Sequence, residues 1–155
     1  DRTSRGLGDV YKRQIFDTWG GLLSGDNYEK FSLNYIQKII SSTYTEGVPV
    51  IYYSRSKSNF DKLKNLDIDC IGVSSENNLG DMYKFFDEKF AIQGNLNTDI
   101  LKEDKDTIKK GVIKTLETFP FETGHVFNLG TGITPDIHPD KVSYLVDQVR
   151  ELSVK

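Results

Sequence analysis

The segment Gly124-His125-Val126-Phe127-Asn128-Leu129-Gly130-Thr131-Gly132-Ile133 shows the pattern that decides the fold of this chain. Its apolar run has the length of a strand and ends in a polar, glycine-rich turn. From Pro139 onward, apolar residues recur at helical spacing, and proline suits the first helical position because no backbone donor is needed there. The segment therefore predicts a strand over 125–129 and a helix that begins at Pro139.

Four similar strand–helix units precede this one. The first expected strand ends at Phe16. The other expected strands cover 48–53, 70–73 and 90–93, and three expected helices cover 60–66, 79–88 and 105–119.

The remaining helix follows the first strand. It is expected to start at Asp26, where Glu29 completes a capping-box pattern, and to end before Gly47. Its spacing predicts one apolar face made of Phe31, Tyr35, Ile36, Ile39 and Ile40.

Five consecutive strand–helix units predict an α/β fold with a parallel sheet covered by helices. Each expected strand ends in Gly, Ser, Thr, Asn or Asp, and both barrels and doubly wound open sheets bind ligands at that end. Five units are too few to close an eight-stranded barrel. From the residues alone, the chain is either a small open α/β domain or part of a barrel.

The composition excludes several classes of protein. A net charge of −3 offers no general attraction for nucleic acid or anionic membranes. No apolar run is long enough to span a bilayer, and no secretory signal is evident. The single cysteine, Cys70, fits a reducing cytoplasm, and two histidines make a dedicated metal site an unexpected feature.

Residues 1–14 are set apart from the rest of the chain. They carry three of the five arginines and show no apolar periodicity. The string from Ser4 to Gln14 resembles translated sequencing-adapter read-through, and a native disordered tail is the alternative. We therefore expect 1–14 to be a non-native leader and 15–155 to form the folded part.

Two strand ends carry polar groups suited to a ligand. Asp17 and Thr18 place a carboxylate and a hydroxyl directly after the first strand. The turn at 128–132 offers backbone N–H groups that suit an anion. The alternative is a pair of ordinary tight turns, with Asp17 closing the first and Trp19 packed as a hydrophobe. For the two histidines, His125 and His138, packing or capping is expected rather than metal binding.

Taken in order, the motifs of this chain resemble those of the uroporphyrinogen decarboxylases. Residues 16–21 read Phe-Asp-Thr-Trp-Gly-Gly, and 31–36 are similar to Phe-Ser-Leu-Pro-Tyr. Residues 93–96 match the start of Gln-Gly-Asn-Leu-Asp-Pro, with Asn97 and Thr98 in place of Asp-Pro. Residues 124–133 resemble Gly-His-Ile-Phe-Asn-Leu-Gly-His-Gly-Ile, with Thr131 at the histidine position.

The resemblance implies the last five strand–helix units of a (β/α)8 TIM barrel. It implies an enzyme without cofactor or metal that converts the acetate side chains of uroporphyrinogen III to methyl groups, giving coproporphyrinogen III and CO2. The full-length protein would be a cytoplasmic homodimer. The substrate-binding residues implied in this chain are Thr18, Asn128, Gly130 and the altered Thr131, while the arginines and the aspartate of the family site would lie upstream.

Two other functions stay open beside the decarboxylase. One is a corrinoid- and zinc-dependent methyltransferase of the same barrel superfamily, although Cys70 has no histidine close to it in sequence. The other is a relative that binds a tetrapyrrole without decarboxylating it, because threonine at 131 carries no charge and moves no proton near neutral pH. The 155-residue chain alone is expected to be inactive and poorly stable.

Overall fold

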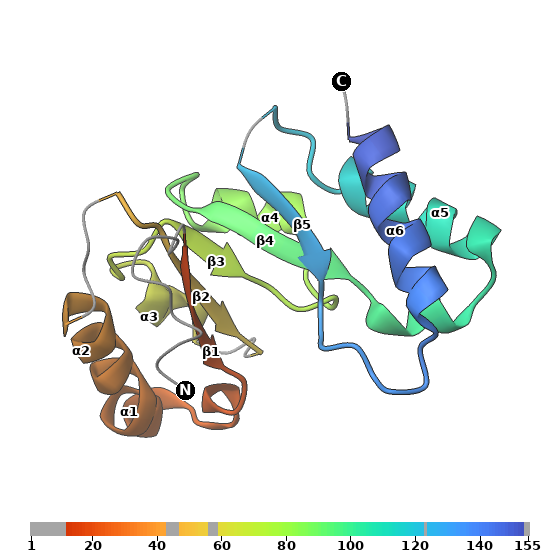
Figure 1. Cartoon of the computed structure of the whole chain (residues 1–155). Helices are drawn as coiled ribbons and strands as arrows, with labels where there is room; N and C mark the ends of the chain where they lie inside the picture. Colours follow the sequence, from red (N-terminus) through yellow and green to blue (C-terminus); the bar gives the residue numbers. More distant parts are fainter. Residues whose placement is uncertain (1–11, 43–46, 56–58, 123, 154–155) are drawn as a thin grey trace. The chain divides into compact units, whose positions relative to one another are not determined.

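The computed structural model describes residues 12–42, 47–55, 59–122 and 124–153. The chain divides into two compact units, residues 1–72 and residues 73–155. Each unit is built from parallel strands with helices beside them, as Figure 1 shows. The expected α/β class is therefore confirmed, and each unit is described by itself below.

Unit 1 contains three parallel strands, β1 (Arg13–Asp17), β2 (Val50–Ser54) and β3 (Cys70–Gly72). Residues in register share a face of the sheet. Ile15, Tyr52 and Ile71 form one row, and the last two have no exposed surface. Phe16 and Tyr53 lie on the opposite face, where Phe16 is 69% exposed.

A long helical segment follows β1 in unit 1 (Figure 1). It comprises a 3₁₀ turn η1 (Gly20–Leu22), helix α1 (Gly25–Tyr28), a π-helical stretch η2 (Glu29–Leu33) and helix α2 (Asn34–Ser42). The expected N-cap at Asp26 is wrong, because α1 already begins at Gly25 and Ser24 holds the cap position. The end expected before Gly47 lies beyond Ser42, and residues 43–46 are outside the described residues.

The five residues expected on one face of this helix differ in burial. Ile36 and Ile40 are 4% and 5% exposed, whereas Phe31, Tyr35 and Ile39 are 59%, 57% and 44% exposed. At about 100° per residue, the five positions spread over roughly half of the helix circumference. A helix that lies on a sheet buries only part of such an arc. The side chains of Phe31, Tyr35 and Ile39 therefore form an exposed apolar stripe.

The short helix α3 (Phe60–Leu63) completes unit 1. Phe60, Leu63 and Leu66 are all buried, as their spacing predicts. The loop before it includes residues 56–58, which lie outside the described residues.

Unit 2 contains the parallel strands β4 (Ala91–Leu96) and β5 (His125–Leu129). Its helices are α4 (Leu79–Phe85), the 3₁₀ helix η3 (Thr98–Lys102), α5 (Lys105–Glu117) and α6 (Pro139–Leu152). Side chains of Asn78, Asn97, Asp104 and His138 accept hydrogen bonds from backbone N–H groups at the helix starts. β4 runs to Leu96, three residues beyond its expected end, and therefore includes Gly94 and Asn95.

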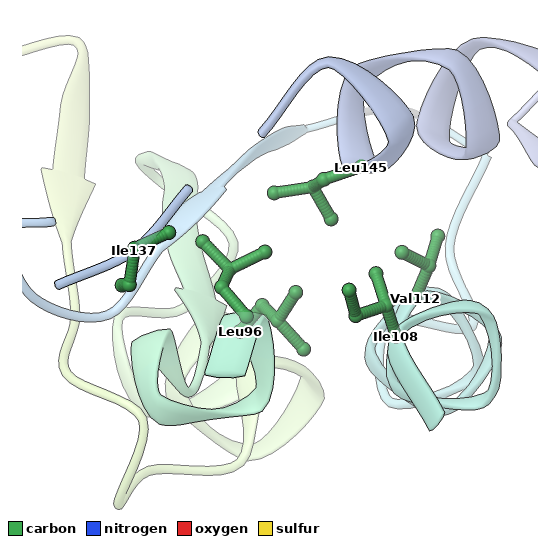
Figure 2. Close-up of a cluster of buried hydrophobic side chains, with 6 residues drawn as sticks. Leu96, Ile108, Val112, Ile137 and Leu145 are labelled. Atoms are coloured by element: carbon green, nitrogen blue, oxygen red, sulfur yellow. The ribbon is translucent and has the colours of Figure 1, made fainter. Parts of the chain in front are cut away.

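The core of unit 2 lies where β4, α5 and α6 meet. Figure 2 shows Leu145 of α6 facing Ile108 and Val112 of α5, with Leu96 at the end of β4 and Ile137 beside it. All are at most 7% exposed, and each buried aliphatic side chain contributes about 1.5–3 kcal/mol. This cluster fixes the carboxyl ends of β4 and β5, because Leu96 and Leu129 pair across them.

The expected leader and the expected lack of a membrane-spanning segment can be examined only in the described residues. β1 includes Arg13 and Gln14 of the expected leader, and residues 1–11 are outside the described part, so the leader stays a prediction. Among the described helices, none has the length and apolar character needed to cross a membrane.

Candidate functional site

Asp17 closes the turn that follows β1. Its Oδ1 accepts a hydrogen bond from the Gly20 N–H at 2.9 Å, and its Oδ2 accepts one from Ser32 Oγ at 2.6 Å. A Cβ built on Gly20 would lie 2.0 Å from Asp17 Oδ2, so a side chain at position 20 would displace the carboxylate. The turn role considered for Asp17 is therefore confirmed.

Two buried tyrosines support the same carboxylate. Tyr52 OH donates to Asp17 Oδ2 at 2.9 Å, and the Tyr28 and Tyr52 hydroxyls lie 2.9 Å apart. Because the Tyr52 proton goes to Asp17, Tyr28 donates to Tyr52. Neither tyrosine is exposed, and burial raises the pKa of both hydroxyls, so both remain donors at neutral pH.

Thr18 and Trp19 occupy the middle of the Asp17 turn. Trp19 is 69% exposed, so packing of this ring as a hydrophobe is wrong for the described residues. The inward position of the turn is taken by the Asp17 carboxylate instead. Thr18 is partly buried and hydrogen-bonds to no other residue in the described part of the chain, which leaves its hydroxyl available to a ligand.

Asn95 and Asn128 are in register on β4 and β5. Asn95 is buried, and its Nδ2 donates to the carbonyl oxygens of Ser74 and Asn77 at 2.9 and 2.6 Å. Asn128 is exposed, and its Oδ1 accepts from the Leu129 N–H at 2.8 Å. The Asn128 amide nitrogen makes no hydrogen bond within the described residues and can donate to a ligand.

Gly130 fits a close contact with another backbone segment. A Cβ at this position would lie 2.5 Å from the Ser75 nitrogen, so a side chain is excluded. The Gly130 N–H donates to the Leu96 carbonyl at 2.8 Å. This donor is therefore already used, and the anion cradle expected at 128–132 does not include it.

Thr131 forms a hydroxyl pair with Thr98. Thr131 Oγ1 donates to Thr98 Oγ1 at 2.9 Å, and Thr98 Oγ1 donates to the Thr131 carbonyl at 2.9 Å. Thr98 is 4% exposed, while Thr131 is exposed. The hydroxyl proton of Thr131 is thus engaged by Thr98. The Thr131 oxygen can therefore accept a hydrogen bond from a ligand but cannot donate one.

Both histidines have the structural roles expected for them. His125 Nε2 lies 2.8 Å from the Gly94 carbonyl, and its ring stacks on Phe119. Burial lowers the pKa of His125, and the neutral ring donates to the carbonyl. His138 caps α6 through Nδ1, which accepts from the Asp140 N–H at 3.3 Å.

No group of three His, Cys, Asp or Glu side chains suited to a metal occurs among the described residues. Cys70 is 5% exposed, and burial raises the pKa of its thiol to about 12. A metal ligand must be a thiolate, so this environment opposes metal binding by Cys70.

Sequence spacing missed the partners of Asp17. Tyr28, Ser32 and Tyr52 come from three different elements, and no motif joins them. One physical signal was present: a tyrosine in a buried strand such as β2 needs a hydrogen-bond partner for its hydroxyl. The pairing of Thr98 with Thr131 left no comparable signal in the sequence.

A sequence model of the family described as uroporphyrinogen decarboxylase matches residues 11–152. The chain belongs to the uroporphyrinogen decarboxylase family. Uroporphyrinogen decarboxylases of Pseudomonas putida and Legionella pneumophila are each 37% identical to it, over 147 and 142 residues. These alignments cover 92% and 90% of this chain but only 42% and 40% of the relatives, so the chain spans about two-fifths of their length.

A solved structure supports the assignment of the fold. A methyltransferase from Methanosarcina mazei matches with a TM-score of 0.75 at 19% identity, covering 92% of this chain and 42% of the other. The uroporphyrinogen decarboxylase fold is the (β/α)8 barrel, and this chain contains five of its strand–helix units. The open-sheet alternative is therefore set aside.

Two residues that the resemblance sets apart from the family motifs contact each other. Thr98 is expected at the proline position of Asp-Pro, and Thr131 at the histidine position of Asn-Leu-Gly-His-Gly. The hydroxyl pair joins these two residues, which lie 33 positions apart. The Thr131 side chain is neutral, and its proton is engaged within the chain.

Proposed function

We propose that this chain is the C-terminal part of a uroporphyrinogen decarboxylase. The full-length enzyme would convert the acetate side chains of uroporphyrinogen III to methyl groups, giving coproporphyrinogen III and CO2. The observation that carries the proposal is the family match over 11–152, which includes the polar ends of β1 and β5. A cytoplasmic homodimer is the assembly that we propose for the full-length protein.

Thr18 and Asn128 are the proposed donors to the substrate. Uroporphyrinogen carries carboxylates, and a carboxylate accepts hydrogen bonds from hydroxyl and amide groups. The Thr18 hydroxyl and the Asn128 amide nitrogen bond to no other described residue, which supports both assignments.

Gly130 and Thr131 have a different part in the proposed site. Gly130 contributes by its lack of a side chain, which allows the close contact with Ser75. Thr131 offers lone pairs, which suit a protonated carboxyl group or a pyrrole N–H better than a carboxylate. No catalytic residue is assigned in this chain.

The groups that promote decarboxylation would come from the upstream part of the protein. Protonation of a pyrrole ring creates positive charge, which a carboxylate stabilises in a cleft that excludes water. Loss of CO2 from the acetate then neutralises the ring and leaves a methylene carbon. This carbon takes a proton to become methyl, and the ring releases the proton that it gained at the start, which restores the pyrrole. The chain holds only Arg55 and Arg150 beyond residue 14, so a cluster of arginines for the polyanionic substrate is also assigned upstream.

The proposal is tested with the chain joined to the N-terminal part of a uroporphyrinogen decarboxylase, taken from its own gene where that encodes one. The joined protein should release CO2 from uroporphyrinogen III and form coproporphyrinogen III. A folded but inactive protein would count against the decarboxylase. Stoichiometric binding of zinc or a corrinoid would instead favour a methyltransferase.

The hydroxyl pair favours one further candidate, a relative that binds the tetrapyrrole without decarboxylating it. Threonine at 131 cannot carry the charge of the histidine, and its proton is engaged by Thr98. The variant Thr131→His separates the two functions in the joined protein. A large gain in turnover would favour the binding protein, and unchanged turnover of an already active wild type would favour the enzyme.

A further inference from the structure

The Asp17 carboxylate accepts three hydrogen bonds within unit 1, and a fourth residue supports one of the donors. The Gly20 N–H, Ser32 Oγ and Tyr52 OH donate to it directly, and Tyr28 OH donates to Tyr52. A carboxylate has about four acceptor sites, so three are occupied within the chain. This arrangement joins β1, the stretch η2, strand β2 and helix α1 at one atom group.

Asp17 lies on the face of the sheet that is covered by helices. In register, it shares that face with Ile15 and Tyr52, whereas Phe16 lies on the other face. Thr18 and Trp19 follow directly in the chain. The Thr18 hydroxyl makes no hydrogen bond within the described residues, and the Trp19 ring is exposed. The Asp17 carboxylate itself therefore lies on the helix-covered face, away from Phe16.

We propose that Asp17 is a positioning residue that holds the turn 17–20 and thereby sets the Thr18 hydroxyl and the Trp19 ring at the carboxyl end of β1. The identity of the molecule that they meet rests on the proposed function. Asp17 is not proposed to bind the substrate itself, because its carboxylate already accepts three hydrogen bonds from within the chain. Without the Asp17 carboxylate, the turn 17–20 would lose its fixed orientation. Misplacement of a substrate-binding group by about 1 Å can lower the rate of an enzyme by about a hundredfold.

Trp19 provides a direct readout, because it is the single tryptophan of the chain and lies inside the turn. The 155-residue protein is compared with Asp17→Ala, Asp17→Asn and Tyr52→Phe by time-resolved fluorescence anisotropy. Asp17→Ala should release the ring and lower its residual anisotropy. Asp17→Asn retains an acceptor for the Gly20 N–H and should restore part of it, and Tyr52→Phe should give an intermediate loss.

Asp26→Ala is the matched control, since it removes an exposed carboxylate from the first turn of α1. Its anisotropy should equal that of the wild type. Circular dichroism of every variant checks that the helices are retained. Equal anisotropy of Asp17→Ala and wild type, with helices retained, would overturn the proposal.

The joined full-length protein provides the second readout. Asp17→Ala should lower kcat/KM by about tenfold to a hundredfold, and Asp17→Asn, which keeps one acceptor oxygen, should recover part of the loss. Equal loss in both variants would assign Asp17 a charge-dependent role and contradict positioning. An inactive wild type would refute the decarboxylase alone, because the anisotropy of Trp19 still decides the role of Asp17.

Discussion

At the scale of single residues, the sequence located the polar strand ends but not what their side chains do. Thr18 and Asn128 keep donors free for a ligand in the described part, as a substrate site requires. Gly130 and Thr131 have the predicted place, yet their donors are bonded to Leu96 and Thr98. Hydrogen bonds between residues far apart in sequence decided this difference, and no local pattern encodes them.

The Thr98 hydroxyl gives a first prediction at this scale. Thr98→Val removes a buried donor and leaves the Thr131 hydroxyl without its acceptor, which should cost about 1–2 kcal/mol locally. The hydrogen-exchange protection of the Gly130 amide, measured by NMR, should fall accordingly. Thr98→Val combined with Thr131→Val should cost less than the sum of the single changes. Strict additivity would contradict a coupled pair.

His125 gives a prediction about pH. Because burial lowers its pKa in the folded protein, the unfolded chain binds more protons on acidification. The histidine thus stabilises the fold fully above its ordinary pKa of about 6.5, and this contribution falls as the pH drops through the lowered pKa. Thermal unfolding from pH 7.5 to about 5 should show less acid loss for His125→Phe. His138→Asn, which keeps an N-cap side chain, should retain the acid loss.

At the scale of elements, the types and order of helices and strands followed from periodicity and caps. The fifth strand, 125–129, and the start of α6 at Pro139 were predicted to the residue. The helix after β1 was not, because its apolar residues cover a wider arc than one sheet can bury. β4 also exceeded its expected end, since polar Asn95 forms hydrogen bonds that spacing does not reveal.

Two of the three isoleucines of α2, Ile36 and Ile39, give a matched test of this arc. Ile36→Ala removes a 4% exposed side chain and should lower the free energy of unfolding by about 2–4 kcal/mol. Ile39→Ala removes a 44% exposed one and should cost less than about 1 kcal/mol. Urea denaturation followed by circular dichroism measures both. Similar costs at the two positions would mean that the exposed stripe is covered in solution.

At the scale of the whole molecule, the residues alone left both an open sheet and part of a barrel possible. Parallel strands with polar ends occur in both, and only the resemblance and then the family match separated them. The reason is physical, because closure of a barrel requires eight strand–helix units and the described residues form five. The catalytic groups could not be located here for the same reason.

The partial barrel gives a prediction for the isolated chain. Within the described residues, β1 pairs only with β2 and β5 only with β4, so each has an edge available for pairing with another chain. The 155-residue protein should be inactive towards uroporphyrinogen III and should self-associate at micromolar concentration. Size-exclusion chromatography and calorimetry measure this. A monomer with one cooperative transition would contradict it.

The burial of Cys70 at the start of β3 gives the molecule an internal chemical reporter. As the sole thiol, with a pKa raised to about 12, it should resist iodoacetamide while β3 stays folded. Alkylation then proceeds only when unit 1 opens, and its rate at increasing temperature measures how often this happens. Joining the upstream part should slow that alkylation. The change in rate, followed as the mass shift on Cys70, would then measure how much the rest of the barrel stabilises unit 1.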